Sequence, residues 1–242
     1  MEFHIIIPAR AKSKRLPGRN TKLLLGKPLI QYSIESALEI LEPSNIWVNS
    51  DDLSVIKIAK SFGVQTLVRP VELSSDYTST AEVLEHQVSH LMKKVNCDAI
   101  ILLQPTNPFR NINFVNEAIR IFQDSGRESL ATFSSSNRKL GKIVNNIFEP
   151  INYSFGQRSQ DLDSSYYENG LLYITKTKAI LRGEILTEDV YPLICDNLGI
   201  NVWDLIKITN RHPRVNILQP GPGVGGHCIP VDPYYMIQRA AD

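Results

Sequence analysis

The stretch that decides the fold is FHIIIPARAKSKRLPGRN, from Phe3 to Asn20. Its first six residues, Phe3–Pro8, form an apolar run that predicts a buried strand. The loop that follows carries a hydroxyl at Ser13, a flexible backbone at Gly18 and five cations with no acid among them. Cations this close together favour an anionic partner, and open α/β sheets bind phosphorylated ligands in loops at the carboxyl ends of strands. A solvated basic loop is the alternative. The five cations are Arg10, Lys12, Lys14, Arg15 and Arg19.

Strand-like and helix-like patterns alternate along the chain after this loop. Short apolar runs predict strands at 5–7, 46–48, 64–68, 99–103, 130–133 and 171–174. Apolar residues at helical spacing predict helices over 30–41, 55–62, 80–95 and 112–122, with Met92 and Val95 among the inward residues of the third. Alternation of this kind predicts an α/β fold, a mostly parallel sheet with helices on both faces.

The pattern loosens between about residues 134 and 168, where polar residues predict an irregular arm or hairpin. It changes again near Pro192, beyond which proline and glycine are dense and no further sheet element is expected. We therefore expect a sheet domain over 1–193. The remainder, 194–242, has too few apolar residues for a core of its own.

Composition excludes several classes of protein. The net charge of +1 over 242 residues gives no support to nucleic-acid binding. No apolar run approaches the roughly 18 residues that a membrane span needs. The three cysteines, Cys97, Cys195 and Cys228, lack metal-ligand spacing and suggest a reducing compartment. With no leader-like N-terminal segment, the expected location is the cytoplasm.

Two more polar clusters follow predicted strands or begin predicted helices. The segment LQPTNPFR follows the strand at 99–103, and Gln104 within it both donates and accepts hydrogen bonds, which suits a sugar hydroxyl or a base edge. Its two prolines, Pro105 and Pro108, could instead simply shape a turn. The cluster DYTST, residues 76–80, precedes the third helix, where Ser79 or Thr80 could bind a ligand or only cap the helix.

These residues resemble the acylneuraminate cytidylyltransferases, the CMP-sialic acid synthetase family. The resemblance begins in IIPARAKSKRLPGRNTKLLLGKPLIQYSIESAL and covers roughly residues 3 to 190. It continues in order through NSDD (49–52), LVRPVEL (67–73), DYTST, LLQPTNPFR, QRSQDL (157–162) and YYENGLLYI (166–174).

The resemblance implies a Rossmann-like nucleotidyltransferase fold with a projecting dimerisation arm, and hence a homodimer. It implies that CMP passes from CTP to a nine-carbon α-keto acid sugar of the sialic, legionaminic or pseudaminic type, with Mg²⁺ as cofactor. Arg10, Arg19 and Gln104 are the implied catalytic residues. The implied nucleotide contacts are Arg10, Ser13, Arg19, Asn20 and Ser79 or Thr80. Those implied on the sugar side and the arm are Gln104, Arg158, Gln160, Tyr167 and Asn169.

The chain departs from the family pattern at several positions. Lys12 stands where the family usually has glycine, and Arg19 stands where it often has lysine. The more serious departure is the lack of a paired-aspartate motif after the last core strand. A divalent ion bridging phosphates needs such carboxylates, and Asp196 and Asp204 have the wrong spacing.

The segment from about residue 194 to 235 has a resemblance of its own. It is similar to an internal piece of UDP-sugar dehydrogenases, especially the UDP-N-acetylmannosamine type, in which the cysteine at the position of Cys228 is the catalytic nucleophile. The run GPGVGG, residues 221–226, fits G-x-G-x-x-G, but the prolines around it leave no strand before it and no helix after it. We therefore expect no NAD binding. His227 and Cys228 are adjacent, so their side chains are expected to point apart and not to act as a base and nucleophile.

Three functions remain open from the sequence. The leading hypothesis is a CMP-sugar synthetase whose C-terminus has been replaced by a dehydrogenase fragment, through recombination or an assembly error. The second is the same chimera binding nucleotide without turnover, because the metal motif is missing. The third, a piece of a UDP-N-acetylmannosamine dehydrogenase, is disfavoured because a cofactor domain is not expected in this chain.

Overall fold

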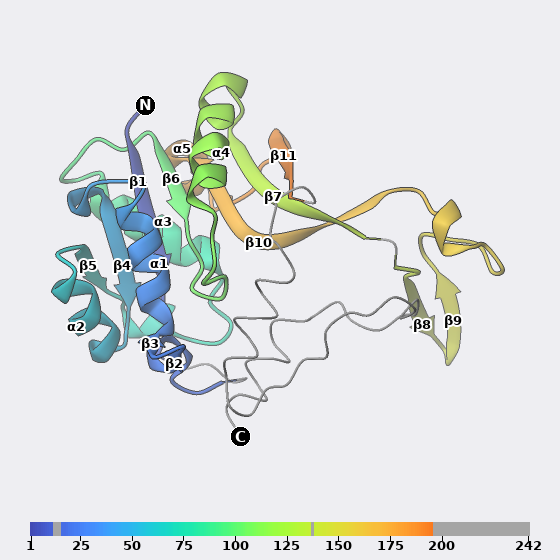
Figure 1. Ribbon diagram of the computed structural model, residues 1–242, viewed down its shortest axis with the longest axis horizontal. Helices are drawn as coiled ribbons and strands as arrows, with labels where there is room; N and C mark the ends of the chain where they lie inside the picture. Colours follow the sequence, from blue (N-terminus) through green and yellow to red (C-terminus); the bar gives the residue numbers. More distant parts are fainter. Residues whose placement is uncertain (12–15, 137, 196–242) are drawn as a thin grey trace.

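The computed structural model describes residues 1–11, 16–136 and 138–195 (Figure 1). Seven strands form one sheet in the order β11-β7-β10-β6-β1-β4-β5. The prediction of a mostly parallel sheet is confirmed, because β1 pairs with β4 and β6, and β4 pairs with β5, all parallel. These strands are β1 (Phe3–Pro8), β4 (Ile46–Ser50), β5 (Gln65–Val68) and β6 (Ala99–Leu102).

Two features of the rest of the sheet were not predicted. β10 (Ser165–Lys176) runs antiparallel to both β6 and β7 (Ser129–Ser136). A strand that was not expected, β11 (Val190–Ile194), pairs parallel with β7. β11 extends past Pro192, so the expectation of no sheet element beyond that residue is wrong for Leu193 and Ile194. Pro192 is tolerated because β11 is an edge strand, where proline's missing donor leaves no buried partner unsatisfied.

Helices cover both faces of the sheet, as predicted (Figure 1). On one face, α1 (Leu29–Leu38), α2 (Leu53–Ser61) and α4 (Ile112–Ser125) contribute apolar residues to one buried cluster. On the other face, α3 (Thr80–Leu91) and α5 (Thr177–Ile180) contribute to a second. β1 joins the two layers because its side chains alternate: Ile5 and Ile7 belong to the first cluster and Ile6 to the second.

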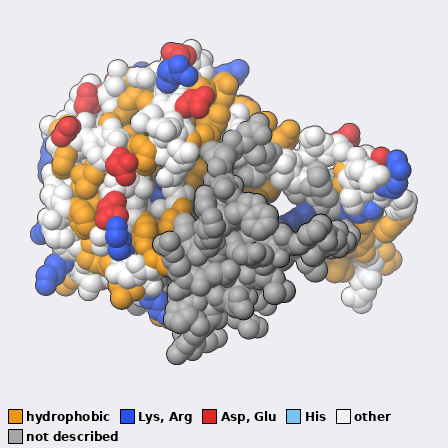
Figure 2. All heavy atoms as spheres, in the orientation of Figure 1, with side chains coloured by type: hydrophobic (Ala, Val, Ile, Leu, Met, Phe, Trp, Pro, Cys, Tyr) orange, Lys and Arg blue, Asp and Glu red, His pale blue; other side chains and the backbone are white. Residues whose placement is uncertain are grey.

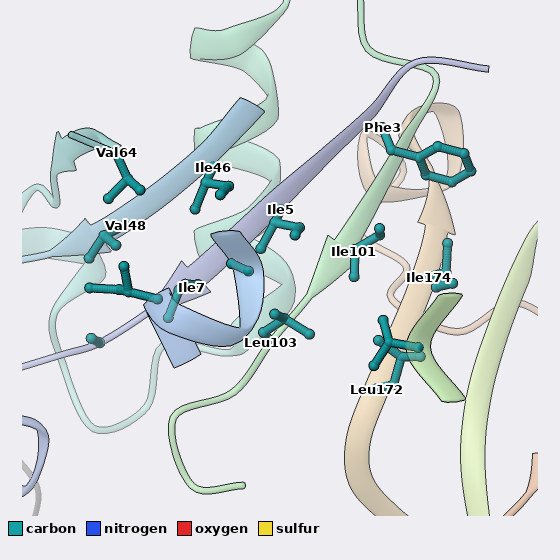
Figure 3. Close-up of a cluster of buried hydrophobic side chains, with 14 of the residues drawn as sticks. Phe3, Ile5, Ile7, Ile46, Val48, Val64, Ile101, Leu103, Leu172 and Ile174 are labelled. Atoms are coloured by element: carbon teal, nitrogen blue, oxygen red, sulfur yellow. The ribbon is translucent and has the colours of Figure 1, made fainter. Parts of the chain in front are cut away.

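Figure 3 shows the first cluster, to which neighbouring strands contribute side chains that point to the same face. Ile5 pairs with Ile46 on one side and with Ile101 on the other, and all three are completely buried. The apolar runs in the sequence are therefore continuous because these strands are covered on both faces. A rigid centre of this kind fixes the strand ends from which the loops begin.

Two helices end earlier than the sequence predicts. α1 ends at Leu38 and α3 at Leu91. Met92 and Val95, expected to point inward, are 49% and 41% exposed. The chain turns at this point, with Lys94 and Val95 both donating to the Leu91 carbonyl, so the apolar spacing continues after the helix has ended.

A projecting arm occupies much of the region between β7 and β10, where the sequence predicts an irregular arm or hairpin. β8 (Gly141–Val144) and β9 (Ile147–Pro150) form an antiparallel hairpin, and a short helix, η4 (Ser159–Asp161), follows. Figure 1 shows this hairpin well away from the seven-stranded sheet. Asn145 and Asn146 form its turn with positive φ angles of 50° and 63°, a conformation that asparagine tolerates better than most residues.

Short elements complete the described part of the chain. They are η1 (Arg19–Thr21), β2 (Leu23–Leu24), β3 (Lys27–Pro28), η2 (Pro43–Asn45) and η3 (Val71–Leu73). Across the described ranges, no helix has both the length and the apolar character that crossing a bilayer requires.

Candidate functional site

The order of the strands reverses beside β1, which creates a topological switch point in the sheet. The chain passes from β1 to β4 and β5 on one side, then returns to β6 on the other. Because β1 and β6 are parallel, the loops that follow them begin at the same edge of the sheet, where open α/β sheets bind ligands. The backbone confirms that they are neighbours, since the Leu103 amide donates to the Ile6 carbonyl at 3.1 Å. The predicted basic loop and the Gln104 segment thus start side by side.

Arg10 is the first residue of the basic loop with a charged side chain, and it does not lack a counter-ion. Its Nη1 lies 2.9 Å from Asp76 Oδ1 and donates to the Ser75 carbonyl at 3.4 Å. The expectation that the loop depends on an external anion is therefore corrected for this residue, because a carboxylate far along the chain already pairs with it. Ser13 and the cations from Lys12 to Arg15 lie outside the described residues.

Asn20 anchors the other end of the loop. It is only 3% exposed, and its Nδ2 donates to the Arg10 carbonyl at 3.0 Å. Its Oδ1 is buried and has no hydrogen-bond partner among the described residues, so one acceptor stays available at this edge. Gly18, with φ of 66°, precedes η1 and allows the turn that places Arg19 and Asn20 here.

Arg69 is a second cation at this edge, and the sequence reasoning missed it. It follows β5 directly and is 6% exposed. Its Nε donates to Asn49 Oδ1 at 2.7 Å and its Nη2 to the Asn49 carbonyl at 3.1 Å. Burial lowers the pKa of the Arg69 guanidinium, while the nearby Asp51 opposes that shift. Its place directly after a predicted strand was the signal that could have identified it.

The DYTST cluster caps a helix. Ser79 Oγ accepts from the Glu82 amide at 3.2 Å, and Glu82 Oε2 accepts from the Ser79 amide at 2.6 Å, which makes a capping box on α3. The Ser79 hydroxyl also donates to Glu82 Oε2 at 2.8 Å. The capping role of Ser79 is therefore directly observed, and Thr80 is the first residue of the helix itself.

Replacing Ser79 with alanine tests the capping role. Loss of both Ser79 side-chain bonds is expected to lower the free energy of unfolding by about 1 kcal/mol, a typical cost for losing an N-cap. Thermal unfolding with and without CTP separates the two roles. If Ser79 only caps α3, the stabilisation gained from CTP stays the same, and a loss of that gain would show that it contacts nucleotide. Thr80→Ala is the matched variant.

Gln104 lies against an irregularity in β10. The register of β10 on β7 shifts between Glu168 and Tyr173, and Gly170 within it has φ of 70°. A Cβ on Gly170 would lie 3.3 Å from Gln104 Oε1, and Asn107 Nδ2 donates to the Gly170 carbonyl at 2.8 Å. The structure therefore brings the loop after β6 and this bulge together.

Asn169, predicted on the sugar side, is engaged within the bulge. Its Oδ1 accepts from Thr132 Oγ1 at 2.6 Å and from the Leu171 amide at 3.0 Å. Its Nδ2 donates to Ser134 Oγ at 3.0 Å. The side chain thus holds β10 to β7 beside Gln104.

The other predicted sugar-side residues belong to the arm and to the part of β10 that leads from it. Arg158 pairs with Asp161 at 2.7 Å, and Gln160 is exposed in η4. Tyr167 is 54% exposed on β10. Figure 1 shows the arm pointing away from the ends of β1 and β6, so within one chain Arg158 and Gln160 do not join the group around Arg10.

The described residues do not offer a magnesium site. Three acids at this edge have structural partners: Asp51 accepts from the Ala11 amide at 2.7 Å, Asp52 caps α2, and Asp76 pairs with Arg10. Across the described ranges, no three histidine, cysteine, aspartate or glutamate side chains gather as metal ligands. The donor set therefore does not fit the ion that the resemblance implies. Asp196, Asp204 and Cys228 lie outside the described residues.

Comparison with known proteins divides the chain near residue 190. A family model described as cytidylyltransferase matches residues 4–193, and one described as the central domain of the UDP-glucose/GDP-mannose dehydrogenase family matches residues 189–242. The CMP-N,N'-diacetyllegionaminic acid synthase of Legionella pneumophila is 31% identical, over 84% of this chain and 90% of its own length. The N-acylneuraminate cytidylyltransferase of Escherichia coli is also 31% identical, over 73% of this chain.

Other relatives match only partly. The UDP-N-acetyl-D-mannosamine dehydrogenase of Methanococcus vannielii is 37% identical over 41% of this chain. The chain spans 27% of the length of that enzyme and 42% of the E. coli cytidylyltransferase. Among solved structures, CMP:2-keto-3-deoxy-manno-octonic acid synthetase in complex with CTP has a TM-score of 0.57 at 20% identity, covering 80% of this chain and 90% of its own. The likeness shows the same fold.

Proposed function

Because the chain belongs to the cytidylyltransferase family, we propose that it transfers CMP from CTP to a nine-carbon α-keto acid sugar. The anomeric hydroxyl of the sugar attacks the α-phosphorus of CTP. One oxygen–phosphorus bond forms, the bond from that phosphorus to the bridging oxygen breaks, pyrophosphate leaves with that oxygen, and the hydroxyl proton passes to solvent. The products are a CMP-sugar and pyrophosphate.

The observation that carries this proposal is the meeting of two loops at the switch point. Arg10 and Asn20 belong to the loop after β1, and Gln104 belongs to the loop after β6. Catalysis of phosphoryl transfer depends mainly on positioning and on cations placed against phosphate charge. Arg10, with Ser13 and Arg19, would bind the triphosphate, Asn20 would hold the nucleotide, and Gln104 would face the sugar. No step is assigned to Mg²⁺, because the described residues lack its ligands.

Product analysis tests the reaction. The protein is incubated with CTP, Mg²⁺ and each of sialic, legionaminic and pseudaminic acid, and the mixture is followed by phosphorus NMR. The proposal expects the α-phosphate signal of CTP to be replaced by that of a CMP phosphodiester, with an equal amount of pyrophosphate. CDP or CMP without a sugar adduct would instead indicate hydrolysis.

Asp76 is expected to compete with the triphosphate for Arg10. Its carboxylate lies 2.9 Å from the guanidinium, and both side chains are about one-third exposed or less. Asp76→Asn removes the competing charge, so we expect the Kd for CTP to fall about threefold, in the range of a partly exposed ion pair. Calorimetry measures the Kd. Asp161→Asn, which breaks the Arg158 pair on the arm, is the matched control, and a weaker Kd in Asp76→Asn would contradict this role.

The arm is proposed to bind a second copy of the chain, which makes the protein a homodimer. Figure 2 shows hydrophobic side chains gathered on the arm, away from the main body. Exposed apolar groups of this density mark interaction surfaces. Arg158, Gln160 and Tyr167 would then reach the site of the partner subunit. The apolar residues of the arm that are at least 41% exposed are Leu140, Ile143, Ile147, Phe148, Ile151 and Phe155.

Gly141→Ala tests the dimer through the fold of the arm. A Cβ at Gly141 would lie 2.1 Å from the Phe148 ring and 2.7 Å from the Glu149 carbonyl oxygen, so the hairpin must shift. We expect sedimentation to show a dimer for the natural chain and a weaker dimer for Gly141→Ala. Gly183→Ala, away from the arm, is also strained because Gly183 has φ of 82°, although its Cβ meets nothing within 4 Å; it controls for a general loss of stability and should remain dimeric. A monomeric natural chain would contradict the proposal.

A chimera that binds CTP without turnover is the second candidate. Two observations favour it: the described residues hold no metal-ligand cluster, and the dehydrogenase model takes over at residue 189. It predicts CTP binding by calorimetry, negligible turnover, and partial recovery when a C-terminal segment with an Asp-x-Asp motif replaces residues 194–242. Sequencing the source DNA across residues 189–197 tests whether the junction is natural. A UDP-sugar dehydrogenase activity is not proposed, because only residues 189–242 match the central domain of that family.

A further inference from the structure

Arg110 connects three parts of the fold beside the proposed sugar side. Its Nη2 donates to the Gln104 carbonyl at 2.5 Å, its Nε to the Leu171 carbonyl at 3.1 Å, and its Nη1 to Ser33 Oγ at 3.1 Å. These acceptors belong to the loop after β6, to the β10 bulge and to α1. A single guanidinium therefore fixes the start of the Gln104–Arg110 loop against two other elements.

The electrostatic setting of Arg110 is unusual for a purely structural residue. Within the described part of the chain, its partners are two carbonyls and a hydroxyl, and no carboxylate pairs with it. Burial lowers the pKa of Arg110 to about 9, which leaves it protonated at neutral pH. Arg110 is partly buried, and a partly buried cation held by neutral acceptors without a counter-ion carries a desolvation cost, so its presence here calls for a reason beyond packing.

That reason lies in the geometry of Gln104. The loop from Gln104 to Arg110 contains two prolines and makes one other side-chain bond to the bulge, from Asn107 to the Gly170 carbonyl. Gln104 Oε1 already lies within 3.3 Å of the Cβ position of Gly170, so a small movement of the loop changes where the amide points. Lysine could not replace the guanidinium, because a single ammonium cannot span three separate acceptors with a planar fork.

We propose that Arg110 is a positioning residue for the acceptor sugar, acting through Gln104. The inference rests on the proposed function. Arg110 holds the Gln104 backbone at the bulge, and Gln104 presents its amide to the sugar acid. CTP, bound at the β1 loop, is not affected.

Arg110→Lys tests the positioning role in steady-state kinetics. We expect the KM for the sugar acid to rise about tenfold, while the KM for CTP stays within about twofold, because ground-state contacts are lost on one substrate only. Arg120→Lys, on the exposed face of α4, is the matched control and should change neither constant. Equal increases in both KM values, or none, would overturn the proposal.

A double-mutant cycle shows whether Arg110 acts through Gln104. In a Gln104→Ala background, Arg110→Lys should produce no further increase in the KM for the sugar. If the two residues acted independently, the increases in KM from the two substitutions would multiply. Asn107→Ala tests the same coupling if Arg110→Lys does not fold, because it removes the neighbouring bond between loop and bulge. Asn107→Ala should also raise the KM for the sugar acid without changing the KM for CTP, and it should do so only when Gln104 is present.

A crystal structure of Arg110→Lys separates this inference from the proposed function. The inference predicts that the Gln104 side chain moves by about 1 Å or more, a displacement large enough to matter for catalysis, while β6 and α4 stay in place. An unmoved Gln104 overturns the positioning role even if the natural chain is active. A displaced Gln104 in a protein whose natural form makes no CMP-sugar supports the positioning of this side chain and counts only against the proposed function.

Discussion

Replacement of Arg10 by alanine is expected to lower kcat/KM for CTP by about a hundredfold or more, the usual cost of removing one donor aimed at developing charge. Arg10 begins the loop at the switch point, and Asn20 fixes its backbone at 3.0 Å. Its guanidinium is therefore held at the edge of the sheet to which the proposed function assigns the triphosphate. The substitution also removes the guanidinium 2.9 Å from Asp76, so it takes one positive charge away from the region proposed to bind the triphosphate.

The control for this effect is Arg127→Ala. Arg127 also pairs with a carboxylate, that of Asp189. It lies just before β7, at the opposite end of the strands from the loop that carries Arg10. We expect its kcat/KM to stay within about threefold of the natural chain, as for an exposed ion pair. Arg10→Ala with activity in that same range would contradict the assigned site, and equal losses in both variants would indicate general damage to the fold.

Phe122→Ala is expected to be the most destabilising of the substitutions considered. The Phe122 ring is 1% exposed and packs edge-on against Phe3 of β1, with ring centroids 6.2 Å apart. Removing a buried ring of this size costs about 3–5 kcal/mol, because the lost contacts leave a cavity. For a chain of this length the loss corresponds to a fall of about 6–20 °C in Tm.

Leu53→Ala provides the comparison for that measurement. Leu53 is the first residue of α2, away from the arm, and is 76% exposed, so its loss should change the free energy of unfolding by about 0.5 kcal/mol or less. Thermal unfolding followed by circular dichroism measures both variants. Similar Tm values for the two would show that the β1–α4 contact does not support the core in the way described here.

The sequence predicted the parallel half of the sheet well because strands covered on both faces leave continuous apolar runs. β1, β4 and β6 are such strands, and Ile5, Ile46 and Ile101 are wholly buried. The direction of a strand is harder to infer from the sequence than its burial. The run at 171–174 reads the same whichever way the strand points, so the antiparallel course of β10 could not be inferred. β11 was hidden by Pro192, which usually argues against a strand.

The sequence predicted which loops are neighbours, but not the partners of their side chains. Loops that follow neighbouring parallel strands begin at the same end of the sheet, and the loops that carry Arg10 and Gln104 do so. The Asp76 carboxylate reaches Arg10 across a separation in sequence that no local pattern reveals. Asn169 was assigned to the sugar, although its amide holds the β10 bulge. Arg69 and Arg110 were missed, because their importance comes from burial and from distant carbonyl acceptors.

The release of pyrophosphate tests the central claim most directly. The natural chain is mixed with CTP and with sialic, legionaminic or pseudaminic acid, in the presence and absence of Mg²⁺, and pyrophosphate is measured by a coupled assay. The account predicts release that needs both CTP and one of the three acids and that is lost in Arg10→Ala. A folded chain that releases none with any of these acids would contradict it.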